Sequence, residues 1–376
     1  MQITTPHSLR HRPKAQQVCT QLTEMAYSLG PEAKLPTVLK LRDQMGVSLR
    51  TLDGALKALE ADNIIYRIQG VGIFVSPSLQ RHVALMCMPD FFEQVGVSPF
   101  WRLMVESATE RAKAKNEAFS CHFTIPGGHK GAPMHAGLAR EIEAREMHGV
   151  LGIGLDENTV AWIEERGIPY VAFAGSGRWT VGLDNEQLLD MGVKELASLG
   201  CKRLSCWSTG LPFERSGPTD RAGEIELENE KDSMWRKALQ EHGLEIHEEL
   251  SQNLAHLDCV GYSHQEQGFN LAHDIFSAPR STWPDGILCY DDLMTHGLLL
   301  ALEKMDMRVG QDVHIVSHAN RNSPVLMGRE HQITRLEYDP AEIVRMMFDI
   351  LETVMDGGVY GTAITRVKPT LYQPTR

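Results

Sequence analysis

The first regular pattern along the chain is a set of apolar residues at helical spacing. Between positions 14 and 29 they recur every three to four residues, which predicts a helix that ends at Gly30-Pro31. Thr37 is placed to cap a second helix that closes at Gly46, and Ser48 to cap a third. The short turn "MGVS" between these two helices is typical of a helix-turn-helix.

The third helix is followed by two predicted strands. Residues 64–66 and 73–75 are apolar or aromatic and flank the glycine-containing turn "RIQGVG". Three helices and a hairpin together predict a winged helix-turn-helix, which places its third helix in the major groove of DNA. We assign this domain to residues 1–78.

Beyond residue 78 the pattern changes to short buried strands that alternate with helices. One series runs from "HVALMCM" to "IPYVAFA". A second runs from "RLSCWS" through "EIHEEL", which we interpret as a strand, to "VHIVSH". This alternation predicts an α/β fold with parallel sheets covered by helices. Two similar series in residues 79–376 predict two lobes with a cleft between them.

Charge is unevenly distributed between the two predicted domains. The net charge is −12, yet residues 1–78 contain nine Lys and Arg against six Asp and Glu, a local +3 that leaves −15 for the rest. Only the front domain is suited to meet a polyanion.

Cysteine and histidine give no sign of a metal or redox site. The seven cysteines are scattered without C-x-x-C spacing, so we expect reduced thiols. Of the candidate histidine pairs, only His314 and His318 have four-residue spacing, and their segment is predicted to be a strand. We therefore expect no metal and no cofactor. No long apolar stretch is present and the N-terminus is polar, so we expect a cytoplasmic protein without a membrane partner.

Enzyme motifs are also missing from the sequence. The glycine-rich segments "PGGHKG" and "GVLGIG" lack the pattern of a P-loop or a dinucleotide fingerprint, and no G-x-S-x-G elbow occurs. We expect a protein that is not an enzyme.

The front domain resembles a known family. The run Leu35-Pro36-Thr37, then "LRDQMGVS", then "TLDGALKALEADNIIYRIQGVGIFV", resembles the DNA-binding domain of the GntR family of bacterial repressors. Three positions depart from the family pattern, because Leu39, Leu49 and Asp53 stand where arginines usually face DNA. The resemblance implies double-stranded operator DNA as a partner, but not which operator.

Candidate DNA-binding residues lie on the second and third helices and in the wing. Arg50, near the start of the third helix, could reach a base edge or only a phosphate. The candidates are Lys40, Arg42, Ser48, Arg50, Thr51, Lys57, Arg67 and Gly70.

The large domain resembles a second family. Residues 181–208 and 284–318 are similar to the sensor domain of LacI-type repressors, which has the fold of periplasmic sugar-binding proteins. The combination with a GntR front domain resembles the arabinose-repressor branch. The resemblance implies a small-molecule effector, most simply a carbohydrate, held between the lobes.

The resemblance also suggests ligand-binding residues. Asp292, in "YDDLM", matches an effector-binding aspartate of the LacI family; alternatively it caps the next helix, a role that Asp291 could take instead. Either Arg221 or Lys231 could supply a cation. The candidates are Phe92, Phe100, Trp101, Arg221, Lys231, Tyr262, Asp292 and Asn320. Any one of the first three could equally be a residue of the apolar core.

The sequence as a whole predicts a transcription regulator, in the first place a repressor, that acts as a homodimer because two-fold operators need two copies. The alternative is a ligand-binding protein that no longer uses DNA, which Leu39, Leu49 and Asp53 favour.

Overall fold

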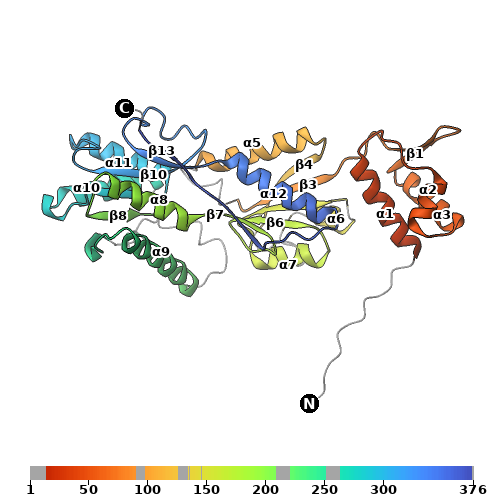
Figure 1. The fold of residues 1–376 in the computed structure, drawn as a ribbon, viewed down its shortest axis with the longest axis horizontal. Helices are drawn as coiled ribbons and strands as arrows, with labels where there is room; N and C mark the ends of the chain where they lie inside the picture. The colour runs from red at the N-terminus through yellow and green to blue at the C-terminus, as the bar shows by residue number, and fades with distance from the viewer. Residues whose placement is uncertain are drawn as a thin grey trace, which may run out of the picture. The chain divides into compact units, whose positions relative to one another are not determined.

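The computed structural model describes residues 14–89, 98–125, 134, 136–144, 146–208, 221–250 and 263–374, with only the backbone of 221–230. The chain forms two compact units. The first comprises residues 1–82 with 116–118, and the second comprises residues 83–115 with 119–376. Figure 1 shows the first unit in red and orange. In the described part of the chain, no helix is both long and apolar enough to cross a membrane.

The first unit begins with three helices whose ends are fixed by local hydrogen bonds. They are α1 (Lys14–Leu29), α2 (Val38–Met45) and α3 (Leu49–Ala61). Thr37 accepts a hydrogen bond from the backbone of α2 and Ser48 accepts one from α3, as their cap positions predicted. Gly46 ends α2 at a φ of 60°, a conformation that glycine adopts without strain.

A two-stranded wing completes the first unit. Strand β1 (Ile65–Ile68) pairs antiparallel with β2 (Gly72–Val75). Gly70 in the connecting turn has a φ of 73°. One apolar core joins helices and wing, and its fully buried members include Leu22, Leu41, Leu52, Leu56, Leu59, Ile65 and Val75. The predicted winged helix-turn-helix is therefore confirmed.

The first lobe of the second unit is built on a sheet in the order β12-β7-β6-β5-β3-β4. Its strands are β3 (His82–Cys87), β4 (Ala118–Phe123), β5 (Gly149–Ile153), β6 (Tyr170–Phe173), β7 (Thr180–Leu183) and β12 (Ile364–Val367). Its helices are α5 (Pro99–Ala114), α6 (Ala136–Glu143), α7 (Glu157–Glu165) and α12 (Pro340–Met355). Helices α5 and α12 pack against each other (Figure 1).

The second lobe contains a sheet in the order β13-β11-β10-β9-β8. Its strands are β8 (Leu204–Trp207), β9 (Gly286–Cys289), β10 (His314–Asn320), β11 (Thr334–Tyr338) and β13 (Thr370–Tyr372). Its helices are α8 (Asn185–Ser198), α9 (Arg221–Glu241), α10 (His264–Ser277) and α11 (Asp292–Lys304). Strands β8 to β11 pair in parallel, as the alternation predicted, and only β13 pairs antiparallel.

The chain passes between the lobes three times. It crosses from β7 to α8, returns from β11 to α12, and crosses again from β12 to β13. The hydroxyl of Tyr338 donates a hydrogen bond to the carbonyl oxygen of Asp184 over 2.9 Å, which ties two of these crossings together.

The prediction of a strand in "EIHEEL" is wrong. The segment ends in a 3-10 turn, Glu248–Leu250, whose acidic side chains face solvent and pair with Arg236 and Arg203. The segment lies beside β8, because the Ser205 hydroxyl donates to the carbonyl oxygen of Leu250. With only Leu250 buried, it lacks the continuous apolar face of an inner strand.

Candidate functional site

The third helix of the first unit presents one face to its core and another to solvent. Leu52, Ala55, Leu56 and Leu59 are buried, whereas Leu49, Arg50 and Lys57 are exposed. Two of the predicted DNA contacts already have a local role: Ser48 Oγ accepts from the Thr51 backbone N–H at 3.1 Å and lies 2.9 Å from the Thr51 hydroxyl. Such a cap fixes the start of the helix that would enter a groove.

Several of the cations on this exposed surface form ion pairs with acidic side chains. Asp53 Oδ2 lies 3.0 Å from Lys57 Nζ, one turn along α3, and its Oδ1 lies 3.3 Å from Arg67 Nη1 of the wing. The hydrogen bonds from Lys57 and Arg67 hold the pKa of Asp53 below its ordinary value. Arg67 also pairs with Glu60 at 3.3 Å.

The other candidates of the first unit differ in how they are paired. Arg42 Nη2 lies 2.5 Å from the neighbouring Asp43. Lys40 and Arg50 form no ion pair with any described residue. Leu39 and Leu49 are 57% and 48% exposed, so these two departures from the family pattern lie on the surface.

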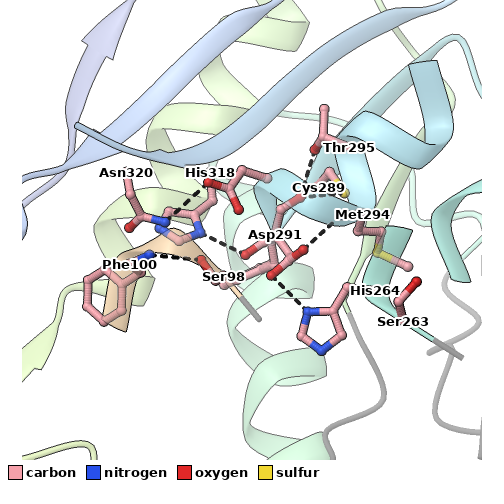
Figure 2. A network of polar contacts seen from close by, with 12 residues as sticks. Ser98, Phe100, Ser263, His264, Cys289, Asp291, Met294, Thr295, His318 and Asn320 are labelled. Atoms are coloured by element: carbon pink, nitrogen blue, oxygen red, sulfur yellow. Dashed lines mark hydrogen bonds and ion pairs between the residues drawn. The ribbon is translucent and has the colours of Figure 1, made fainter. Parts of the chain in front are cut away.

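In the second lobe, the carboxyl end of β9 leads directly into an acidic pair. Asp291 caps α11, accepting from the Met294 backbone N–H at 2.8 Å, so the cap role falls to Asp291 and not to Asp292. Its Oδ2 also lies 3.1 Å from Nδ1 of His264, the first residue of α10 (Figure 2).

Two glycines make this meeting of helices possible. A Cβ at Gly268 would lie 2.1 Å from the carbonyl oxygen of Met294, and one at Gly297 would lie 1.9 Å from that of Gln265. Helices α10 and α11 therefore pack with their backbones in contact. This close packing holds His264 beside Asp291.

Asp291 and His264 form a buried ion pair. Burial alone would raise the pKa of Asp291, but the hydrogen bond and charge of His264 lower it overall. For His264, burial works toward a lower pKa, and the hydrogen bond that it donates to Asp291 and the charges of both aspartates raise the pKa above its ordinary value. Both groups thus favour their charged forms.

Asp292 is buried and only half satisfied. Its side chain is almost wholly enclosed, with 1% of the residue exposed. Oδ2 accepts from Ser323 Oγ at 3.1 Å and from Asn320 Nδ2 at 3.4 Å, whereas buried Oδ1 has no hydrogen-bond partner among the described residues. Burial and the charge of Asp291 raise the pKa of Asp292 to about 7. The carboxyl group can therefore exchange a proton near neutrality.

His318, near the end of β10, presents a second unpartnered atom. Its Nδ1 donates to the carbonyl oxygen of Tyr290 at 2.9 Å, and its ring packs edge-on against Tyr338. Burial lowers the pKa of His318, so the ring is neutral at pH 7 and Nε2 offers a lone pair. Figure 2 shows His318 and Asn320 together with Asp291.

Four connected residues thus present buried polar atoms without partners among the described residues. We call these atoms the polar cluster: Tyr290 Oη, Asp292 Oδ1, His318 Nε2 and Asn320 Oδ1. They lie at or just beyond the carboxyl ends of β9 and β10, two adjacent parallel strands. Ligands of open α/β sheets bind at this edge. Buried polar atoms without partners are costly, and a bound ligand would satisfy them.

Of the remaining candidates for ligand binding, two lie in the first lobe, one lies on α9, and the side chains of the others lie outside the described residues. Phe100 and Trp101 belong to the apolar core of the first lobe, where their ring centroids lie 5.8 and 6.4 Å from that of Phe173. Lys231 is half-buried on α9. Phe92, Tyr262 and the side chain of Arg221 lie outside the described residues.

Sequence reasoning missed His264, Tyr290, His318 and Ser323 as members of this site. A signal was present for His318, a polar residue at the end of the predicted strand "VHIVSH" that we considered only as a metal ligand. In the described part of the chain, no group of three or more His, Cys, Asp or Glu side chains could hold a metal ion.

Comparisons with known proteins agree with both parts of this architecture. Residues 14–75 match the model of bacterial regulatory proteins of the gntR family, and residues 193–373 match that of the periplasmic binding protein-like domain. None of the curated proteins compared with the chain matches it.

Solved structures share the fold at low identity. A LacI-family regulatory protein from Chloroflexus aggregans is 16% identical, with a TM-score of 0.59 over 77% of this chain and 96% of its own. The regulator CelR in complex with cellobiose is 20% identical, with a TM-score of 0.55 over 96% of this chain and 98% of its own. A lac repressor dimer bound to operator is 12% identical, with a TM-score of 0.56 over 79% of this chain and 96% of its own.

The domain match and the winged helix explain why the front of this acidic chain is basic. The second match and the parallel sheets account for the two lobes behind it. The chain joins a DNA-binding domain of the bacterial GntR family to a periplasmic-binding-protein-like domain, which is the architecture of a transcription regulator.

Proposed function

We propose that this regulator responds to a neutral, hydroxyl-rich small molecule, most simply a sugar, that binds at the polar cluster. The observation behind the proposal is the set of four buried atoms at the ends of β9 and β10 that have no partner in the part of the chain that the structure describes. Three of them are acceptors and the fourth is a hydroxyl, which suits the hydroxyl groups of a sugar.

The charges around the cluster favour a neutral ligand over an anionic one. No lysine or arginine in the described part of the chain bonds to Tyr290, Asp292, His318 or Asn320. An ionised Asp292 would repel a phosphate or carboxylate. A sugar phosphate or sugar acid is therefore a poor fit.

Binding would control DNA through the lobes of the second unit. We propose that ligand closes a cleft between the lobes, with Asp292 and Asn320 as its contacts, and that this shifts the population between two states with different affinity for operator. The protein would bind as a homodimer in the cytoplasm, because a two-fold operator needs two winged helices. The lac repressor structure is a dimer on operator, and CelR binds cellobiose, which suggests probes for this chain.

A thermal-shift panel tests the ligand class. Cellobiose, other neutral mono- and disaccharides, sugar acids and sugar phosphates would be added to the full chain and to Asp292→Asn. We expect at least one neutral sugar to raise the melting temperature of the wild type, by an amount that grows with concentration, and to lose most of this effect in the variant.

A control variant separates loss of the site from general damage. Asp274 is exposed on α10 and forms no ion pair with a described residue, so Asp274→Asn removes the same charge elsewhere in the lobe. It should respond to sugar like the wild type. Equal responses of all three proteins, or a response to anionic sugars alone, would refute the proposal.

One observation favours the alternative of a ligand-binding protein that no longer uses DNA. Three candidate cations, Arg42, Lys57 and Arg67, already have carboxylate partners. Binding to duplex DNA that weakens steeply with salt would exclude this alternative, because each neutralised phosphate adds to the salt dependence.

A further inference from the structure

We propose that Asp53 is an internal counter-ion that competes with DNA phosphates for Lys57 and Arg67, and so weakens binding to DNA of arbitrary sequence. This inference rests on the proposed use of DNA. Asp53 joins a cation of α3 to a cation of the wing, two elements that a winged helix places along the duplex. The carboxylate thus lies between two groups that would otherwise meet the backbone of DNA.

The exposure of these groups makes the competition possible. The side chains of Asp53, Lys57 and Arg67 are 48%, 70% and 32% exposed, so water and salt reach all three. Exposed ion pairs are weak and break easily, which means that phosphate can replace the carboxylate. Replacing the carboxylate by a phosphate gains little binding free energy, however, because the released Asp53 stays close to the incoming phosphate and repels it.

Glu60 strengthens the same effect on one side. Its Oε2 lies 3.3 Å from Arg67 Nε, so the guanidinium is shared between two carboxylates, one from the middle and one from the end of α3. Among the described residues, Lys57 forms an ion pair with Asp53 alone. Replacing Asp53 should therefore free Lys57 completely and Arg67 only in part.

The arrangement would favour selectivity over affinity. General binding to DNA depends on how many phosphates a protein neutralises. With Lys57 and Arg67 neutralised internally, the module depends more on Lys40 and Arg50, which form no ion pair with a described residue. Arg50 lies where a base edge can be read, so contacts that carry sequence information make a larger share of the total.

The test compares Asp53→Asn with a control that changes charge equally. Asp62 ends α3, is exposed and forms no ion pair with a described residue, so Asp62→Asn removes one negative charge from the same unit without freeing a cation. Binding of the full chain to a labelled random-sequence duplex would be followed by fluorescence anisotropy over a range of salt concentrations.

We expect Asp53→Asn to bind the random duplex about three- to tenfold more tightly near 0.1 M salt, with a slope of log affinity against log salt steeper by about 1 to 2. Asp62→Asn should shift affinity much less and leave the slope unchanged. If Asp53→Asn matches Asp62→Asn, or binds more weakly than the wild type, the inference is wrong.

A double-mutant cycle identifies the cation concerned. Lys57→Gln should change the slope little in the wild type, where Asp53 already neutralises Lys57, and should reduce it by about 1 in the Asp53→Asn background. Equal effects in both backgrounds would contradict the inference. If no variant binds duplex DNA at all, it is the proposed use of DNA that fails.

Discussion

Asp53 differs in burial from the neighbouring pair Asp291 and Asp292, and this difference separates their roles. Asp53 is half exposed and pairs with two cations that solvent also reaches. Asp291 is 18% exposed at its side chain and pairs with one enclosed histidine, and beside it Asp292 is buried with one oxygen unpartnered. Asp53 can therefore exchange its cations for other partners, whereas Asp291 and Asp292 are held in place.

This contrast suggests what each region responds to. Exposed ion pairs contribute little to stability but set the local charge that a polyanion meets. Buried polar groups are held in fixed positions, and each atom without a partner costs free energy that a ligand can recover. On our two proposals, the charge of the first unit sets its affinity for DNA, and the second lobe responds to a bound ligand.

Removing a buried partner should have the largest effect. We expect Asp291→Ala to lower the free energy of unfolding of the second unit by about 3 kcal/mol, because it removes the carboxylate that pairs with His264 and the cap of α11. All six tryptophans lie in the second unit, so tryptophan fluorescence during urea unfolding measures it alone. Wild-type stability would show that the pair is not buried in the way described.

The pKa of Asp292 predicts a pH dependence of stability in the absence of ligand. Its pKa is about 7 in the folded protein against an ordinary 3.8, so the folded state holds the proton more tightly. Its contribution is therefore most favourable below pH 4 and is lost as pH rises through 7, by at most about 1.4 kcal/mol per pH unit.

Asp292→Asn isolates this contribution from those of the neighbouring histidines. The raised pKa of His264 acts in the same direction as that of Asp292, and the lowered pKa of His318 acts in the opposite direction. Urea unfolding of both proteins from pH 5 to 8 should show the variant gaining stability relative to the wild type as pH rises. A constant difference would mean that Asp292 is ionised throughout.

Two arginines of the first unit should differ because only one is paired. We expect Arg50→Ala to weaken binding to a duplex selected from a random pool by about tenfold or more, as loss of a base contact would. Arg67→Ala should lower the affinity less, because the guanidinium of Arg67 already pairs with Asp53 and Glu60. Anisotropy titrations against selected and random duplexes would measure both. An equal loss on both duplexes for Arg50→Ala would reduce Arg50 to a phosphate contact.

The smallest effect on stability should come from replacing Asp53. We expect Asp53→Asn to leave the unfolding midpoint of the first unit close to that of the wild type, because its ion pairs are open to solvent. Circular dichroism of the full chain, with the signal of the second unit followed separately by fluorescence, would measure this. A clear loss of stability would show that Asp53 holds wing and helix together instead of regulating charge.

The sequence predicted local features better than those that depend on distant segments. Caps at Thr37 and Ser48 and the end of the second helix at Gly46 follow from neighbouring residues, and the structure has all three. Asp292 was found through the resemblance of the large domain to the LacI family, but whether Asp292 or Asp291 caps the helix stayed open.

The parts that the sequence could not predict arise from contacts across the fold. His264 reaches Asp291 only because Gly268 and Gly297 let two helices touch. The pairing of Asp53 with Arg67 links a helix to the wing, fourteen positions apart. The spacing of residues within one element does not reveal contacts between elements. The polar cluster and the pairing of Asp53 could therefore be recognised only in the structure.

The most direct test of the account is the affinity for DNA with and without ligand. A labelled duplex selected from a random pool would be titrated with the full chain in the absence of sugar and in saturating amounts of the neutral sugar that stabilises it. We predict that the dissociation constant changes by about fivefold or more, and that the duplex changes the affinity for the sugar by the same factor. Equal affinities with and without sugar would contradict the claim that this protein couples a small molecule to DNA.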